Sequence, residues 1–360
     1  MIGKLWLEIT SVVEVVSVCF AIPNNLLLIF CIFQKSPKSF GNYRYLMAFF
    51  SYQSIWFSVI TLFLNVNYFT FETSISMFVR RNFFNLPELG MLILTSLACS
   101  SNCMMFVALA VQFIYRYFAM TKNPRISLFD TWKMSLWYMG MIGISVFFGV
   151  IVFVFGVLME YPREDREHFR DSLRETFELP ENSTFYYARM TYYKRSPTGR
   201  VVLDWCSLGC VFLLLLSSIP VIIMFYCGIR TYRRMSQATS QLSNHMKLQK
   251  ELFQALLLQS TVPCIFLFLP STTYFIFPLF NLKLGLLSNI AGITFVIYPV
   301  LDPLVVMYVI KYYRSYVYKV FCLTHKITPM LAESDGQATE RAMNAFNEVS
   351  FHNLGGVLNE

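Results

Sequence analysis

Seven long runs of hydrophobic residues constrain the fold of this 360-residue chain more than any other feature. A helix needs about 20 mostly apolar residues to cross the ~30 Å hydrocarbon core of a membrane. Each run must satisfy its own backbone hydrogen bonds in lipid, and each is too long and too uniform for a barrel strand. The sequence therefore predicts an all-α membrane protein, a seven-transmembrane-helix bundle, with spans near Ser11–Phe33, Tyr45–Leu64, Gly90–Tyr115, Met134–Leu158, Trp205–Ile229, Leu252–Phe280 and Leu284–Ile310.

The composition excludes a single soluble core. Hydrophobic residues make up 56% of the chain and charged residues 14%, whereas soluble domains average roughly 45–50% and about 25%. The net charge of +8 comes from Lys and Arg residues that lie mostly between the hydrophobic runs, as membrane topology demands, so we expect no nucleic-acid partner. Pro23 interrupts the first run, which we interpret as a retained span, not a cleavable signal peptide.

The distribution of basic residues predicts the orientation in the membrane. With the N-terminus outside, 16 Lys and Arg residues fall in cytoplasmic segments and 12 outside. Eight of the outer twelve lie in the predicted extracellular loop 159–200, where eight Asp and Glu residues match them. The same loop holds the sequon Asn182-Ser183-Thr184, and glycosylation requires a position outside the cytoplasm. Both signals favour an external N-terminus, and Asn182 is a candidate glycosylation site.

The segment after the last span alternates basic and aromatic residues over Lys311–Cys322. This pattern predicts a short amphipathic helix at the inner membrane surface, with its cations toward anionic lipid. Cys322 is a candidate palmitoylation site, with an unmodified thiol as the alternative. We expect a seven-helix transmembrane domain over residues 1–326 and a disordered cytoplasmic tail over residues 327–360.

Charged residues are nearly absent from the predicted spans. Glu14 and Asp302 are the two Asp, Glu, Lys or Arg residues in the seven windows. Ion-coupled transporters keep several such groups, so the sequence disfavours a transporter. It shows no catalytic motif and no metal-ligand cluster, and we expect no enzyme, cofactor or metal site. We place Glu14 near the outer interface, while Asp302 beside Pro303 requires a buried partner and suggests a structural or switching role.

Five stretches of sequence resemble a known family. They read KSPKSFGNYRYLM (residues 35–47), QFIYRYFA (112–119), MFYCG (224–228), LQKELFQALLL (248–258) and YPVLDP (298–303). In this order they resemble the nematode seven-transmembrane chemoreceptors of the Str group, which includes odour receptors. The resemblance implies a G-protein-coupled receptor, a plasma-membrane location (often the cilium of a sensory neuron), a small-molecule ligand and a heterotrimeric G protein.

The chain is less similar to rhodopsin-type receptors. Arg116 stands where they have the arginine of their Asp/Glu-Arg-Tyr motif, but Tyr115 replaces the acid, so an ionic lock to the neighbouring carboxylate is absent. Asp302 and Pro303 loosely resemble their Asn-Pro-x-x-Tyr motif. The candidate activation switch and G-protein face is therefore Tyr115, Arg116, Tyr117, Asp302 and Pro303.

We expect a small, largely apolar or volatile ligand in an outer cavity between the third, fifth, sixth and seventh spans. The candidate lining residues lie in the outer halves of their spans, where ordinary helix packing is the alternative role: Cys99, Asn102, Phe106, Cys206, Thr272 and Tyr274. Prolines in the fifth to seventh spans would permit hinges at the cytoplasmic side. The rival functions are a seven-span ligand-gated channel, as in insect odour receptors, and a transporter.

Overall fold

The computed structural model describes residues 2–37, 40–79, 86–158, 163–180, 185–195, 201–203, 205–237, 244–282 and 284–323. The chain divides into two compact units, Met1–Arg314 and Ser315–Glu360. In the described part, seven helical segments are long and apolar enough to cross a membrane, which confirms the predicted seven-helix bundle.

Most helices of the bundle extend beyond the predicted hydrophobic windows, because a helix continues past the hydrocarbon core until its sequence stops it. The last span is the exception: its α-helix is shorter than the predicted window, because Gly285–Ser288 form a 3-10 helix before it. The π-helical segment Cys264–Phe268 follows Pro263 and joins α7 to α8 within the sixth span, a local irregularity typical of a proline in a helix. The spans are α1 (Ile2–Lys35), α2 (Tyr43–Leu64), α3 (Glu88–Met120), α4 (Thr131–Leu158), α6 (Trp205–Gln237), α7 (Asn244–Pro263) with α8 (Leu269–Leu279), and α9 (Asn289–Val309).

Helix α3 is the centre of the bundle. It packs against α2, α4 and α6, while α1 packs against α2 and α9. The most apolar window of α3 is 67% buried, against 22% for α4, which lies at the lipid-facing side. Helices α3 and α4 approach closely at Gly149, where an added Cβ would lie 2.9 Å from the side chain of Ser100. The Ser100 hydroxyl donates to the Ser145 carbonyl at 2.7 Å, a contact between small residues typical of membrane helices.

The loops at one end of the bundle form an antiparallel sheet that the sequence analysis did not predict. Strands β1 (Val66–Phe71) and β2 (Ser74–Val79) make a hairpin, and β3 (Tyr186–Thr191) joins the free edge of β2. A second pair, β4 (Tyr193–Arg195) and β5 (Val201–Leu203), and the helix α5 (Arg163–Phe177) belong to the same region. The strands are confined to loops, so the spanning part is helical throughout its described residues.

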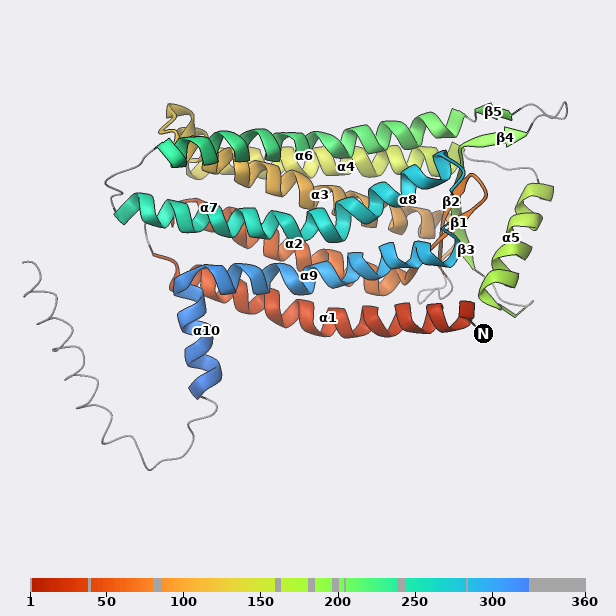
Figure 1. Cartoon of the computed structure of the whole chain (residues 1–360), viewed down its shortest axis with the longest axis horizontal. Coiled ribbons are helices and arrows are strands. Elements are labelled where there is room, and N and C mark those ends of the chain that lie inside the picture. Colours follow the sequence, from red (N-terminus) through yellow and green to blue (C-terminus); the bar gives the residue numbers. More distant parts are fainter. Residues whose placement is uncertain are drawn as a thin grey trace, which may run out of the picture. The chain divides into compact units, whose positions relative to one another are not determined.

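The sheet lies between α5 and the bundle, and successive residues of each strand face opposite sides. On one face, Phe69 and Phe78 pack with Phe177 of α5. On the other face, Ile75 packs with Tyr274 of α8. Figure 1 shows the strands and α5 at the same end of the bundle as the N-terminus of α1. We call this end the sheet end, and the opposite end, where α3 carries Arg116, the Arg116 end.

A helix follows the last span, as predicted. Ile310 has extended backbone (φ −77°, ψ 110°), which ends α9 before α10 (Lys311–Leu323) begins. Tyr313, in the first turn of α10, is fully buried and hydrogen-bonds Ser36 at 2.6 Å, so the start of α10 is fixed to the end of α1. The predicted tail, residues 327–360, lies outside the described residues.

Candidate functional site

A cavity of about 730 Å³ lies under the sheet, and we call it the main cavity. Its walls come from α3, α4, α6 and α8, with strands β2 and β3 above and α5 at its edge. This volume is within the range of small-molecule sites, which are mostly apolar with a few polar groups. The lining fits that description: Phe106, Phe148, Val152, Leu213 and Phe268 are apolar, while Asn102, Ser217, Ser271 and Thr272 are polar.

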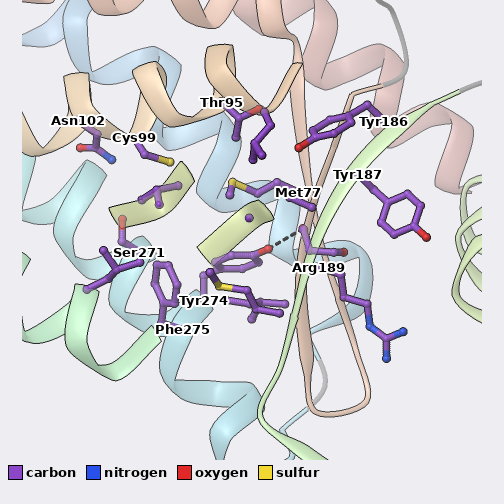
Figure 2. Close-up of a pocket in the computed structure, with 18 of the residues that line it drawn as sticks. Met77, Thr95, Cys99, Asn102, Tyr186, Tyr187, Arg189, Ser271, Tyr274 and Phe275 are labelled. Carbon is purple, nitrogen blue, oxygen red and sulfur yellow. Dashed lines mark hydrogen bonds between the residues drawn. The ribbon is translucent and has the colours of Figure 1, made fainter. Parts of the chain in front are cut away.

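The register of the sheet explains which loop side chains reach the main cavity. Met77 pairs with Ala188, and Ile75 with Met190, so these residues share the face toward the bundle. Figure 2 shows Met77 and Tyr274 near Cys99 and Ser271, whereas Tyr187 and Arg189 extend from the other side of β3. The sheet is therefore a roof over the main cavity, which residues of β2 and β3 line.

Two tyrosines attach the roof to α8. The hydroxyl of Tyr274, labelled in Figure 2, donates to the Ser76 carbonyl of β2 at 2.6 Å. The hydroxyl of Tyr192 donates to the Phe275 carbonyl at 2.8 Å. The ring of Tyr274 also meets Tyr68 edge-on at 5.3 Å. A movement of α8 must therefore shift the roof or break these bonds.

Basic and aromatic side chains gather at the α5 edge of the main cavity. Burial raises the pKa of Tyr187, while the positive charges of Arg166, Arg170 and Arg189 oppose that rise. Burial also raises the pKa of Tyr186 to about 12, so its hydroxyl stays neutral at physiological pH. This edge combines arginine side chains with uncharged phenols, unlike the deeper apolar part.

The structure brings together five of the six side chains predicted to contact ligand. Cys99, Asn102, Phe106, Thr272 and Tyr274 all line the main cavity. Two of their polar atoms, Asn102 Oδ1 and Thr272 Oγ1, are buried without a hydrogen-bond partner in the described structure. The side chain of Cys206 lies outside the described ones. The binding role of all six stays a prediction.

Sequence reasoning missed the loop residues that line the main cavity. Val66–Phe71 and Ser74–Val79 are rich in aromatic and β-branched residues and are separated by Glu72 and Thr73 alone, which is a hairpin signal. That signal could have revealed Met77. The contribution of β3, including Tyr186 and Met190, depends on pairing with a distant loop and has no local signal.

At the Arg116 end, the guanidinium of Arg116 lies inside the bundle against an aromatic ring. Arg116 is 0% exposed, and its guanidinium carbon lies 3.4 Å from the centroid of the Tyr43 ring. Tyr43 also donates to Gln112 Oε1 at 3.0 Å, which holds the ring in place. Tyr115 packs on the Tyr43 ring at 5.4 Å, and Tyr117 is half-buried near Tyr226. Aromatic rings of α2 and α3 thus contact the arginine, and the sequence has Tyr115 in place of the neighbouring acid.

Asp302 has the buried partner that its position demanded. It is 0% exposed and accepts a hydrogen bond from Gln259 Nε2 of α7 at 3.2 Å. Its second oxygen, Oδ1, has no partner among the described residues. The Asp302–Gln259 bond links α9 to α7 on the Arg116 side of the π-helical segment.

Pro303 leaves one carbonyl of α9 without its helical donor, because proline has no N–H to reach the residue four positions earlier. That residue is Pro299, and its carbonyl accepts from Asn25 Nδ2 of α1 at 3.0 Å. Asn25 is fully buried and also donates to the Ala21 carbonyl. A side chain on α1 thus replaces the missing bond of α9.

Comparison with known proteins shows the family to which this chain belongs. The family model for the serpentine type 7TM GPCR chemoreceptor Str matches residues 10–318. The chain belongs to this Str family. It is 29% identical to serpentine receptor class r-10 of Caenorhabditis elegans over 327 residues, 89% of this chain and 94% of the relative. It is 26% identical to G-protein coupled receptor str-33 of the same organism over 313 residues, 84% of this chain and 87% of the relative.

As a Str receptor, the chain is a G-protein-coupled chemosensory receptor and a multi-pass membrane protein, which confirms the resemblance found in the sequence. The family is one of receptors, not of enzymes, and it gives no support to the ligand-gated channel. Two predicted modification sites of this Str receptor stay untested. Asn182 lies outside the described residues, and the side chain of Cys322 lies outside the described ones within α10.

Proposed function

We propose that this Str receptor binds a small, largely apolar chemical cue in the main cavity and thereby activates a heterotrimeric G protein at the Arg116 end. The observation that carries this proposal is the main cavity itself: about 730 Å³, under the sheet and lined by four spans. Its apolar walls favour an apolar body, and the free acceptor and hydroxyl of Asn102 and Thr272 orient polar groups.

Two spans connect the main cavity to the Arg116 end. Helix α3 carries both Asn102 and Arg116, fourteen residues apart, which is about 21 Å along a helix. The sixth span carries Thr272 above the π-helical segment and Gln259, the partner of Asp302, below it. A ligand that prefers one arrangement of α3 and α8 shifts the population of both helices, and this shift opens the Arg116 end to the G protein.

The proposed orientation places the sheet end outside the cell and the Arg116 end in the cytoplasm. Exposed Arg230, Arg233 and Arg234 at the end of α6 and Lys311 at the start of α10 are on the Arg116 end, in agreement with the positive-inside rule. The same residues are available to an acidic surface of the G protein. We place the receptor in the plasma membrane, in the cilium of a chemosensory neuron.

A cavity-filling substitution tests this function. Cells that express the receptor with a G protein are exposed to an odorant panel, and calcium or cAMP is recorded. The Cys99→Phe variant places a ring in the main cavity and should abolish the response to every agonist of the wild-type receptor. The matched control is Cys19→Phe, because Cys19 is exposed on α1. Equal potency in Cys99→Phe and Cys19→Phe, at equal surface expression, would contradict the proposed cavity.

A further inference from the structure

A second, smaller cavity of about 50 Å³ lies beside the main cavity, and we call it the side cavity. It is enclosed by α1, α2, α3 and α9 and by the hairpin β1–β2. The two cavities share four lining residues: Met77, Thr95, Cys99 and Asn102. The side cavity can hold a small end group or a few waters, so any larger molecule in it must have its body in the main cavity.

Glu14 of α1 is the charged group of the side cavity. The sequence placed it near the outer interface, and the structure does bond it to Asn65, the residue that caps the end of α2. However, Glu14 is 3% exposed, so it faces neither water nor lipid. No Lys, Arg or His of the described residues pairs with it. A carboxylate that is buried in a membrane protein requires a cation or a proton, and by default marks a functional site.

Three other polar side chains of the side cavity, Thr61, Thr95 and Asn102, offer hydrogen-bond acceptors beside the hydroxyl of Tyr68 and the thiol of Cys99. The hydroxyls of Thr61 and Thr95 donate to the Phe57 and Met91 carbonyls of their own helices at 3.0 and 2.8 Å. Their hydrogens are therefore used, and their lone pairs stay free. Among the described residues, Asn102 Oδ1 has no hydrogen-bond partner, and it is buried on the wall that the two cavities share.

The hydrogen-bond acceptors of the side cavity indicate which ligand group would fit there. An ammonium carries three N–H donors and no acceptor, so it matches a wall that offers a carboxylate, an amide oxygen and two hydroxyl oxygens. The rings of Tyr68 and Phe295 also line the side cavity, and aromatic faces attract cations. Met77 lies between the two cavities, and its unbranched side chain can move to join them.

We propose that the side cavity is the subsite for a primary ammonium group, which pairs with Glu14 while the apolar body of the same ligand occupies the main cavity. This inference rests on the proposed function, since it names the class of ligand, an alkylamine, for the same site. The shared wall formed by Thr95, Cys99 and Asn102 connects the two parts of that ligand.

The test compares amines with alcohols of equal chain length. The probes are the primary alkylamines from propylamine to hexylamine and the corresponding alkanols, applied to cells with a calcium or cAMP readout. The amines should activate the wild-type receptor at lower concentrations than the alcohols. Glu14→Gln keeps the shape and removes the charge, and it should raise the half-maximal amine concentration by about 30- to 100-fold, as expected for loss of a buried charge pair. The alcohol response should stay within about threefold. The matched control is Glu8→Gln, because Glu8 is an exposed acid on the same helix.

A binding measurement separates this inference from the signalling proposal. Hexylamine should raise the Tm of the purified receptor and of Glu8→Gln, but not that of Glu14→Gln. If neutral compounds activate the receptor while Glu14→Gln leaves amine potency and the Tm shift unchanged, the ammonium subsite is wrong and the proposed function stands. If hexylamine gives the Glu14-dependent Tm shift and no compound signals, the subsite stands and the proposed function is wrong. If hexylamine gives neither effect, the subsite is overturned.

Discussion

The packing of Arg116 on Tyr43 predicts that the aromatic ring, not the hydroxyl, keeps the receptor inactive. The guanidinium carbon is 3.4 Å from the ring centroid, and both residues are buried. In the proposed mechanism this arginine must leave the bundle to reach the G protein. Replacement of Tyr43 by Leu removes the ring and should release Arg116, which raises signalling in the absence of ligand.

The size of the effect follows from the burial of the pair. A desolvated cation–π contact contributes about 2 kcal/mol, which is roughly a 30-fold change in an equilibrium constant. If about 1% of the wild-type receptor is active without ligand, Tyr43→Leu should raise this fraction to about 20–25%. Tyr43→Phe keeps the ring and loses the hydroxyl, which donates to Gln112 and also hydrogen-bonds Arg116; a hydrogen bond is worth about 1 kcal/mol, so its basal activity should rise several-fold less than that of Tyr43→Leu.

The assay is basal cAMP or calcium signalling, normalised to receptor at the cell surface. Tyr115→Leu is the matched control, because the Tyr115 ring lies 5.8 Å from the guanidinium carbon and contributes a weaker contact. The expected order of basal activity is Tyr43→Leu, then Tyr115→Leu and Tyr43→Phe, then wild type. Equal basal activity in Tyr43→Leu and Tyr43→Phe would refute the reasoning, since the ring would then have no holding role.

Two further substitutions test contacts between elements. Asn25→Leu leaves the Pro299 carbonyl without a donor, which should destabilise the receptor by about 1–2 kcal/mol and lower its Tm in detergent. The control is Asn24→Leu, at a half-buried site with a longer 3.5 Å contact, which should change the Tm less. Equal Tm shifts in the two variants would count against the Asn25 bond. Tyr274→Phe removes the donor to Ser76 and should weaken the attachment of the roof by about 1 kcal/mol. Amide hydrogen exchange should then be faster in Ser74–Val79, and unchanged exchange would show that this bond does not hold the roof.

The spanning helices could be predicted from the sequence because runs of this length with almost no charged residues have one stable form in lipid. The ends of the helices could not, since tertiary contacts set them. Helix α1 extends beyond its predicted window at the N-terminal side, where its first turns pack on α5 and Gly3 lies against the backbone of Thr176 and Phe177. The hydropathy of a sequence does not predict a tertiary contact outside the membrane, and so it does not predict this helix end.

Part of the candidate site could also be predicted, because the positions of the spans indicate which residues lie at the same depth. Residues in the outer halves of α3 and α8, such as Cys99 and Thr272, follow from span positions alone, and the structure places both at the main cavity. The roof could not be predicted, because Met77 meets Ala188 across more than a hundred residues. Hydrogen-bond partners from distant helices could not be predicted either. The sequence predicts that Pro303 removes a helical hydrogen bond, but the replacement of that bond by Asn25 depends on how α1 packs against α9.

The central claim is that a ligand in the main cavity activates a G protein at the Arg116 end. The most direct measurement is nucleotide exchange on a purified heterotrimeric G protein by the receptor in lipid nanodiscs, with an agonist found in the cell assay. The agonist should accelerate exchange with wild type and Cys19→Phe, and should fail with Cys99→Phe and Arg116→Ala. Undiminished acceleration in Cys99→Phe or Arg116→Ala, or an agonist-gated current in liposomes that contain the receptor alone, would contradict the account.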